Sequence, residues 1–264
     1  LAAADDITRF FLNNGDFTGA GVVDAGGTLG SLFVLNGDLA GRIEAQAANS
    51  LRVSRGNVLD TAAIDITRDV SSMFFDGDFL GDVNIGSSRG IFMVRGNLGP
   101  DASFVSRDDV GGVMVFGNVS AQASMMIHGD ARMANFMGDF AGQFATYGDV
   151  STVISRGING GMILVGQSTN SAVVIGDMNN ALLSTGVWVG ADGVYNTADD
   201  RIFGGYLRNA VVTGDYTNSA VVAGVLPHLD HGAGVPASNL AYTGDAAGAT
   251  LLDQDSAEAG GLMD

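Results

Sequence analysis

Short stretches of alternating apolar and polar residues recur along this chain about every 20 residues. The stretches are rich in β-formers, as in residues 31–35, 91–94 and 112–116, and none keeps a helical period. Each ends at a glycine that Asp or Asn follows in almost every repeat. These glycines are Gly15, Gly37, Gly56, Gly77, Gly96, Gly117, Gly138, Gly157 and Gly176. A fixed period in this range is typical of a solenoid, in which each repeat stacks on the one before.

Alignment of the repeats on these glycines gives two columns of apolar residues. The first column lies two residues after the glycine: Phe17, Leu39, Val58, Phe79, Leu98, Val119, Phe140, Met178 and Tyr216. The second lies three residues before it: Val34, Val53, Phe74, Met93, Met114, Ile154, Val173 and Val211. Columns of this kind predict an interior in which equivalent residues of successive coils pack together. We therefore predict an all-β fold, a single-stranded parallel β-helix (β-solenoid) with coils of about 20 residues stacked about 4.8 Å apart.

The glycines also show a shorter spacing of about 10 residues, which Gly129, Gly148 and Gly166 complete. This spacing predicts two corners and two β faces in each coil. At the corners we expect glycine to supply positive φ, and Asp or Asn to cap its own turn. Arg55, Asp76 and Arg95 precede three consecutive corner glycines, and they predict an outward ion-pair ladder worth about 1 kcal/mol per pair at most.

The two ends of the chain depart from the repeat. In residues 1–14, Asp5 and Asp6 precede Ile7, Phe10 and Phe11, a spacing that predicts a short helix or irregular plug as a cap. The solenoid is expected over residues 15–248, with insertions at about 187–206 and 225–239, and residues 249–264 form a polar tail. An uncovered solenoid end presents unpaired strand edges, so we expect a homo-oligomer or polymer formed through the ends or edges.

Composition narrows the possible partners. The formal net charge is −17, nearly all acids are Asp, every basic residue is Arg, and Lys and Cys are absent. A chain without a basic stripe is not expected to bind nucleic acid, and one without a long apolar run is not expected to span a membrane. The start at Leu1, without Met or a leader, favours a processed form or a fragment of a secreted protein.

One loop carries the sharpest chemical signal. Asp192, Asn196, Thr197, Asp199 and Asp200 place several oxygen ligands in nine residues beside a glycine. Calcium prefers such ligands from a flexible turn, so the loop predicts a structural calcium site. It lacks the EF-hand spacing. The alternative is an Asx-rich hairpin that holds no metal.

Other candidates have weaker support. His228, Asp230 and His231 offer part of a transition-metal site or an ordinary surface loop, because a complete ligand set is missing. Trp188 is expected either to be exposed as a sugar-binding platform or, more commonly, to be buried against the insertion. We expect core positions for the methionines Met114, Met125, Met126, Met133 and Met137.

The repeats over residues 15–248, together with the DGxxxTxDD loop at 192–200, resemble bacterial extracellular β-solenoid proteins, a broad group of surface-layer, sheath, fibre and adhesin components. The resemblance implies a secreted or cell-surface location and a structural role for calcium. We predict a non-enzymatic structural protein that self-assembles into a filament, sheath or surface layer.

Two alternatives remain open. A β-helical polysaccharide lyase or glycosidase would need acids and bases on one face, and Arg107, Asp108 and Asp109 are the candidates. An adhesin or glycan-binding module would use the loops at 187–206 and 225–239.

Overall fold

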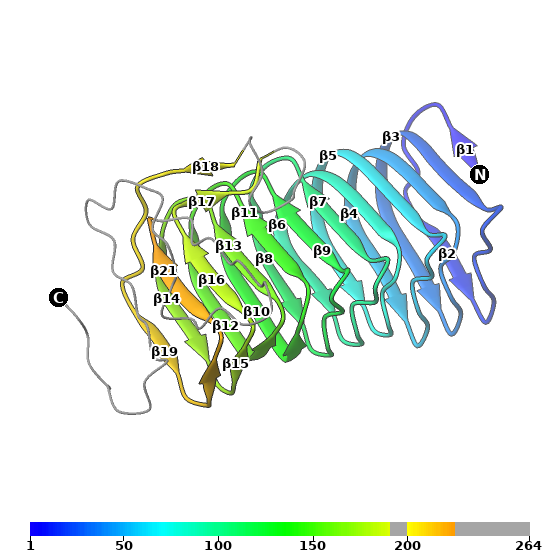
Figure 1. Ribbon diagram of the computed structural model, residues 1–264. Helices are drawn as coiled ribbons and strands as arrows, with labels where there is room; N and C mark the ends of the chain where they lie inside the picture. Colours follow the sequence, from blue (N-terminus) through cyan, green and yellow to red (C-terminus); the bar gives the residue numbers. More distant parts are fainter. Residues whose placement is uncertain (191–199, 225–264) are drawn as a thin grey trace.

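Parallel pairing between residues one coil apart runs through the whole described chain. The computed structural model describes residues 1–190 and 200–224, and these form a β-solenoid whose coils stack along one axis (Figure 1). The predicted fold is confirmed. In the described part of the chain we find no helix long and apolar enough to cross a membrane.

Each coil contributes to two main faces, which we call the A face and the B face. Four long strands cross both faces in turn: β3 (Val22–Leu35), β4 (Arg42–Ser54), β5 (Ala63–Phe75) and β6 (Asp82–Val94). The A face also contains β1 (Ala2–Ala3), β7 (Ser103–Ser106), β9 (Ser124–Ile127), β11 (Gln143–Thr146), β13 (Met162–Val165), β16 (Leu182–Thr185) and β21 (Ala220–Ala223). The B face also contains β2 (Phe10–Asn13), β8 (Val110–Val115), β10 (Ala131–Phe140), β12 (Val150–Asn159), β14 (Thr169–Val174) and β19 (Ala210–Val212).

A short third column completes each coil and confirms the first apolar column of the sequence. Parallel bridges join Phe17, Leu39, Val58, Phe79, Leu98, Val119 and Phe140 in succession. The ends of β10 and β12 continue it, followed by β15 (Met178–Asn179) and β20 (Tyr216–Thr217). Outside this sheet, β17 (Val187–Trp188) pairs with β18 (Arg201–Ile202) in an antiparallel hairpin within the first insertion.

The second predicted column is correct for its first two members and wrong for the rest. Val34 and Val53 are buried, but Val53 pairs with Phe75 rather than with Phe74. In the early coils Asn36 and Arg55, at φ 54° and 57°, add one residue between the strand and the corner glycine. Later coils lack this residue, and a shift of one position moves a side chain to the other face of a strand. Six members therefore point outward: Phe74, Met93, Met114, Ile154, Val173 and Val211.

The corner glycines serve close packing rather than positive φ. A Cβ atom added to Gly117 would lie 2.5 Å from the carbonyl oxygen of Gly96 and 2.6 Å from its carbonyl carbon. The expected positive φ is absent at Gly117, while Asn14, Asn36 and Arg55 adopt it instead. The glycine column thus lets successive corners stack backbone against backbone.

The Asp and Asn residues at these corners form a ladder from coil to coil. The Oδ1 of Asp38 accepts the amide of Asn57 at 2.7 Å, and the Oδ1 of Asn57 accepts the amide of Asp78 at 3.0 Å. The same bond recurs from Asp16 to Asp139, and Asp177 accepts the amide of Asp215. Each side chain therefore caps the next coil and not, as expected, its own turn. We call this series the Asx ladder.

A second, shorter ladder occupies the corner between the A and B faces. Asp109, Asp130 and Asp149 accept the amides of Asp130, Asp149 and Ser168, each at 2.8 Å. The 10-residue spacing of the glycines thus marks a corner between the A and B faces, but the third column gives each coil a third side that two corners and two faces do not account for.

The predicted arginine ladder is only partly formed. Arg95 pairs with Asp76 at 3.1 Å, whereas the Nη1 of Arg55 donates to the Oδ1 of Asn36 at 3.5 Å. Arg55 has a left-handed backbone conformation, and its side chain contacts Asn36 and not Asp76.

Residues 1–14 form strands that pair with the next coil, and neither the short helix nor the irregular plug that the spacing predicts. β1 and β2 both pair with β3, and Ile7 bridges Leu29. Leu12 and Phe10 contact the core, while Phe11 points outward and is 54% exposed. Strand alternation explains this segment better than the i, i+3, i+4 spacing.

Most of the methionines also lie outside the core. Met125 is buried, whereas Met114, Met126 and Met133 are half-buried and Met137 is exposed. Met114 and Met137 occupy outward positions of B-face strands, whereas Met126 packs against a smaller buried cluster that includes Ala145, Leu164 and Val222.

Candidate functional site

A column of polar residues lies on the outward side of the A face, in the coils of β3 to β6. Strand register places Asp24, Glu44, Asp65 and Asn84 opposite one another in successive coils. Arg42 and Asp82 occupy the neighbouring outward column, in which Arg42 pairs with Ala63 and Ala63 with Asp82. Because side chains alternate along a strand, all of these groups point away from the core. We call Asp24, Arg42, Glu44, Asp65, Asp82 and Asn84 the polar patch.

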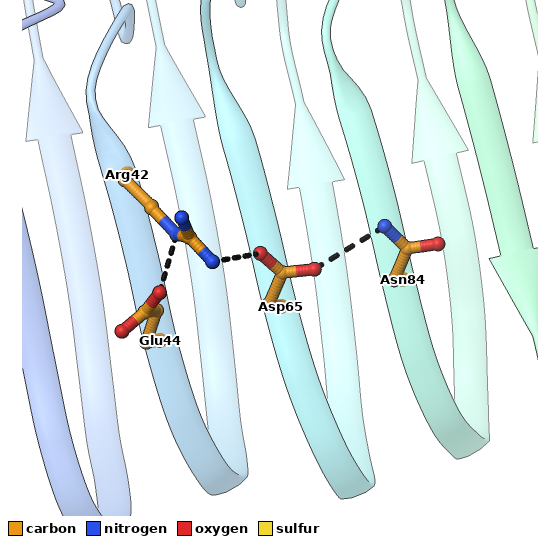
Figure 2. Close-up of polar contacts among 4 residues, drawn as sticks. All are labelled: Arg42, Glu44, Asp65 and Asn84. Carbon is orange, nitrogen blue, oxygen red and sulfur yellow. Dashed lines mark hydrogen bonds and ion pairs between the residues drawn. The ribbon is translucent and has the colours of Figure 1, made fainter.

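A network of direct contacts links the centre of the polar patch (Figure 2). Arg42 forms ion pairs with Glu44 and with Asp65, the second at 3.3 Å from Nη2 to Oδ2. The Nδ2 of Asn84 donates to the Oδ1 of Asp65 at 3.2 Å. The Arg42 side chain is 55% exposed, so each pair contributes about 1 kcal/mol or less. The network fixes the positions of the charges more than it stabilises the fold.

Asp82 lies in an unfavourable environment at the edge of this network. Partial burial raises its pKa above the usual 3.8, and the negative charges of Asp65 and Asp101 raise it further. A raised pKa in the folded state means that ionisation of Asp82 opposes folding.

We predict that Asp82→Asn raises the melting temperature at pH 7. The protonated form of Asp82 stabilises the fold fully below its unfolded pKa, and this contribution is lost as the pH rises through the folded pKa. The increase in melting temperature in the variant should therefore disappear near pH 3. Thermal unfolding followed by circular dichroism at both pH values tests this, and an equal gain at both would contradict the ionic explanation.

The patch has no geometry for metal binding. In residues 1–190 and 200–224, no group of three His, Cys, Asp or Glu side chains is placed to hold an ion. Its chemistry is that of a fixed array of mostly negative charge. Sequence reasoning missed the patch, although the spacing of about 20 residues between Asp24, Glu44 and Asp65 signals a shared column.

The predicted catalytic cluster lies beside the second Asp ladder. Asp108 and Asp109 line an open groove of about 630 Å³, to which Arg89, Asp130 and Arg132 also contribute. Arg107 is not among the lining residues. The Oδ1 atoms of Asp109 and Asp130 accept amides of the next coil, so these two carboxylates have a structural task. The lyase or glycosidase alternative stays a prediction.

Trp188 is buried, with 6% of its surface exposed, so an exposed sugar platform is wrong for this residue. Its ring lies 5.2 Å from that of His128 and 5.4 Å from that of Tyr147. Tyr147 also contacts Phe203, and the Nδ1 of His128 lies 3.0 Å from the carbonyl oxygen of Ser106. These contacts hold both sides of the first insertion against the solenoid.

Most of the predicted metal ligands lie outside the described residues. Asp200 is described and half-buried, whereas Asp192, Asn196, Thr197 and Asp199 fall in the range 191–199. The alternative ligands His228, Asp230 and His231, the second insertion and the tail at 249–264 also lie outside it.

Comparison of the chain with protein-family models, with curated proteins and with solved structures gives no match in any of the three. The function is therefore argued from the geometry of this chain alone.

Proposed function

We propose that this chain is a secreted structural protein, a β-solenoid subunit that assembles end to end into a filament, sheath or surface layer. The observation that carries the proposal is the incomplete coverage of the core at both ends of the described solenoid. Interior coils bury their apolar residues almost completely, whereas the first coil and the B face and third column of the last described coil do not. On the A face of that last coil, β21 is buried. The half-buried residues that contact the core are Ala3, Phe10, Leu12 and Phe17 at one end, and Leu207, Ala210, Val212 and Tyr216 at the other.

The backbone at the two ends supports the same arrangement. β1 and β2 pair with β3 along one edge, and β19, β20 and β21 pair with the preceding coil along one edge. Among the strands of the described ranges, none pairs with their opposite edges. Strand edges of this kind add a further strand readily.

The two ends of the Asx ladder are also complementary, with a backbone amide at one end and a carboxylate oxygen at the other. Within the described chain it begins at Asp16 and ends at Asp215. A second copy placed beyond Asp215 would bring the amide of its Asp16 to the Oδ1 of Asp215. The ladder, the third column and both faces would then continue from one subunit into the next.

We predict that Leu12→Glu raises the protein concentration needed for filaments at least about tenfold. Burial of an unpaired carboxylate at a subunit junction costs several kcal/mol, and Leu12 faces that junction. The matched control is Phe11→Glu, which changes the outward neighbour in the same strand, and the two variants are compared by their content of filaments in electron micrographs, because Phe11 lies on the B face opposite Phe33. Light scattering against concentration measures the effect, and equal behaviour of the two variants would contradict an end-to-end junction.

Calcium binding by the predicted loop belongs to this proposal as a stabilising element. Trp188 is the single tryptophan of the chain and lies in the strand that leads into the loop. We predict a change in its fluorescence on addition of calcium, saturating at about 0.1–1 mM as in other extracellular calcium modules. Chelation should reverse the change, and Asp199→Asn should weaken it. An unchanged spectrum up to 10 mM, a concentration about tenfold above that range, would support the metal-free hairpin.

A further inference from the structure

The outward side of the B face differs from the rest of this acidic chain. Its central column contains Phe33, Arg52, Phe74, Met93 and Met114, paired in that order in successive coils. The column beside it leaves large apolar side chains in contact with solvent, Phe116 at 43%, Met137 at 39% and Ile175 at 57% exposure. Exposed apolar side chains that recur from coil to coil on one face are typical of an interaction surface.

Arginine side chains are fixed on this face. The guanidinium of Arg52 lies 4.9 Å from the centre of the Phe74 ring, and that of Arg95 lies 5.4 Å from it. Arg52 also donates from Nε to the hydroxyl of Ser54 at 2.8 Å. The neighbouring acid, Asp76, is already paired with Arg95. In the coils of β4 to β6 the three arginines Arg52, Arg55 and Arg95 outnumber the one acid Asp76, so this part of the B face carries a net positive charge in a chain of net charge −17.

The polar patch on the A face has the complementary charge in the same coils. The coil that includes β4 carries Glu44 on the A face and Arg52 on the B face. The coil that includes β6 carries Asp82 on the A face and, just after the strand, Arg95 on the B face. Acid and arginine thus lie at the same level along the axis in two coils, and in the coil of β5 between them Asp65 on the A face lies at the level of Phe74 and Asp76 on the B face.

We propose that a second copy of this chain docks alongside the first, with the polar patch of one copy against the B face of the other. The two copies lie in the same axial direction and in register, so that Asp82 of one copy faces Arg95 of the next. Because the two contacting surfaces differ, the contact repeats from copy to copy and produces a layer. This inference rests on the proposed end-to-end assembly for growth along the axis, and it adds growth across it.

Charge complementarity of this kind fixes register and is sensitive to salt. The Debye length falls from about 10 Å at 0.1 M salt to about 3 Å at 1 M salt, which screens exposed pairs. End-to-end contacts made by strand edges and apolar residues do not weaken in this way. Layers should therefore need a higher protein concentration at high salt, where the charged part of the contact is screened and only its apolar part remains.

The decisive experiment exchanges the charges of one coil and examines the assemblies by negative-stain electron microscopy. Arg95→Glu and Asp82→Arg should each raise the protein concentration needed for layers about tenfold or more, because an attractive contact becomes repulsive. The double variant carrying both changes should restore layers at the wild-type concentration. Asp76→Asn, which removes the partner of Arg95 within the same chain, should leave layers intact. Both exchanged side chains are solvent-exposed, and circular dichroism checks that the fold is kept.

The outcomes separate this inference from the proposed function. Layers unchanged in Arg95→Glu, or absent in the double variant, would overturn the lateral contact. Wild-type filaments that stay single at low salt would also overturn it, while end-to-end assembly would stand. Copies that associate sideways without growth along the axis would support the lateral contact and overturn the end-to-end junction.

Discussion

Phe92→Ala is expected to lower the free energy of unfolding by about 3–5 kcal/mol, the usual cost of removing a fully buried aromatic side chain. Phe92 has no exposed surface and lies in the centre of a ring cluster. Its ring centre is 4.4 Å from that of Phe104, 5.5 Å from that of Phe79 and 5.8 Å from that of Phe75. Because these rings come from successive coils, the cavity weakens the stacking of each coil on the next.

Urea unfolding followed by circular dichroism measures this loss. Phe116→Ala is the matched control, since that ring points outward and is 43% exposed. We expect the control to change the free energy of unfolding by less than about 1 kcal/mol. Equal losses in the two variants would contradict the assignment of inward and outward columns.

Gly117→Ala is expected to cost about 3 kcal/mol, since the added methyl group meets backbone atoms that cannot move independently. The nearest atoms, the carbonyl oxygen and carbon of Gly96, would lie 2.5 Å and 2.6 Å from the new Cβ. Relief of this clash requires two coils to separate, which also lengthens the hydrogen bonds of the Asx ladder.

Gly157→Ala is the control at the neighbouring position of this corner, because strand register places Gly157 opposite Asp139 in the Asx column and not among the stacked glycines. Its added Cβ would lie 3.5 Å from the nearest atoms, an ordinary contact distance. We expect little change in stability, or a gain of up to about 1 kcal/mol from the stiffer unfolded chain. Thermal unfolding of the two variants compares them directly. A similar loss in both would mean that the corner needs glycine for its backbone conformation and not for close packing.

The period of the sequence was sufficient to predict the fold and the third column. Residues such as Phe79 and Phe140 follow the corner glycine at a constant distance, because the glycines themselves stack. The distance before the glycine is not constant, since Asn36 and Arg55 each add a residue to the turn. One added residue reverses inside and outside in a strand, which is why Phe74 and Met93 were placed in the core.

The candidate site was harder to predict for a related reason. The polar patch joins residues that lie one coil apart in sequence, such as Glu44 and Asp65, and neither belongs to a local motif. The shifted pKa of Asp82 depends on Asp65 and Asp101, which only the stacking of coils brings near it. Local motifs drew attention to Asp108 and Asp109 instead, where the structure shows a ladder of capping carboxylates.

The three-dimensional arrangement also connects the fold to the proposed assembly. The first and last described coils carry the same backbone edges, Asx residues and half-buried apolar residues that join one coil to the next in the interior. Assembly then needs no new type of contact along the axis. The charged A and B faces add a second direction of growth that salt can control.

Electron microscopy of the purified chain at high salt, with and without calcium, tests end-to-end assembly most directly. High salt weakens the charged lateral contacts, so we expect unbranched filaments that are many subunits long. Their axial repeat should continue across subunit junctions at the coil spacing of about 4.8 Å, visible as a meridional reflection in fibre diffraction. Single short rods at every protein concentration, in both the presence and the absence of calcium, would contradict the account.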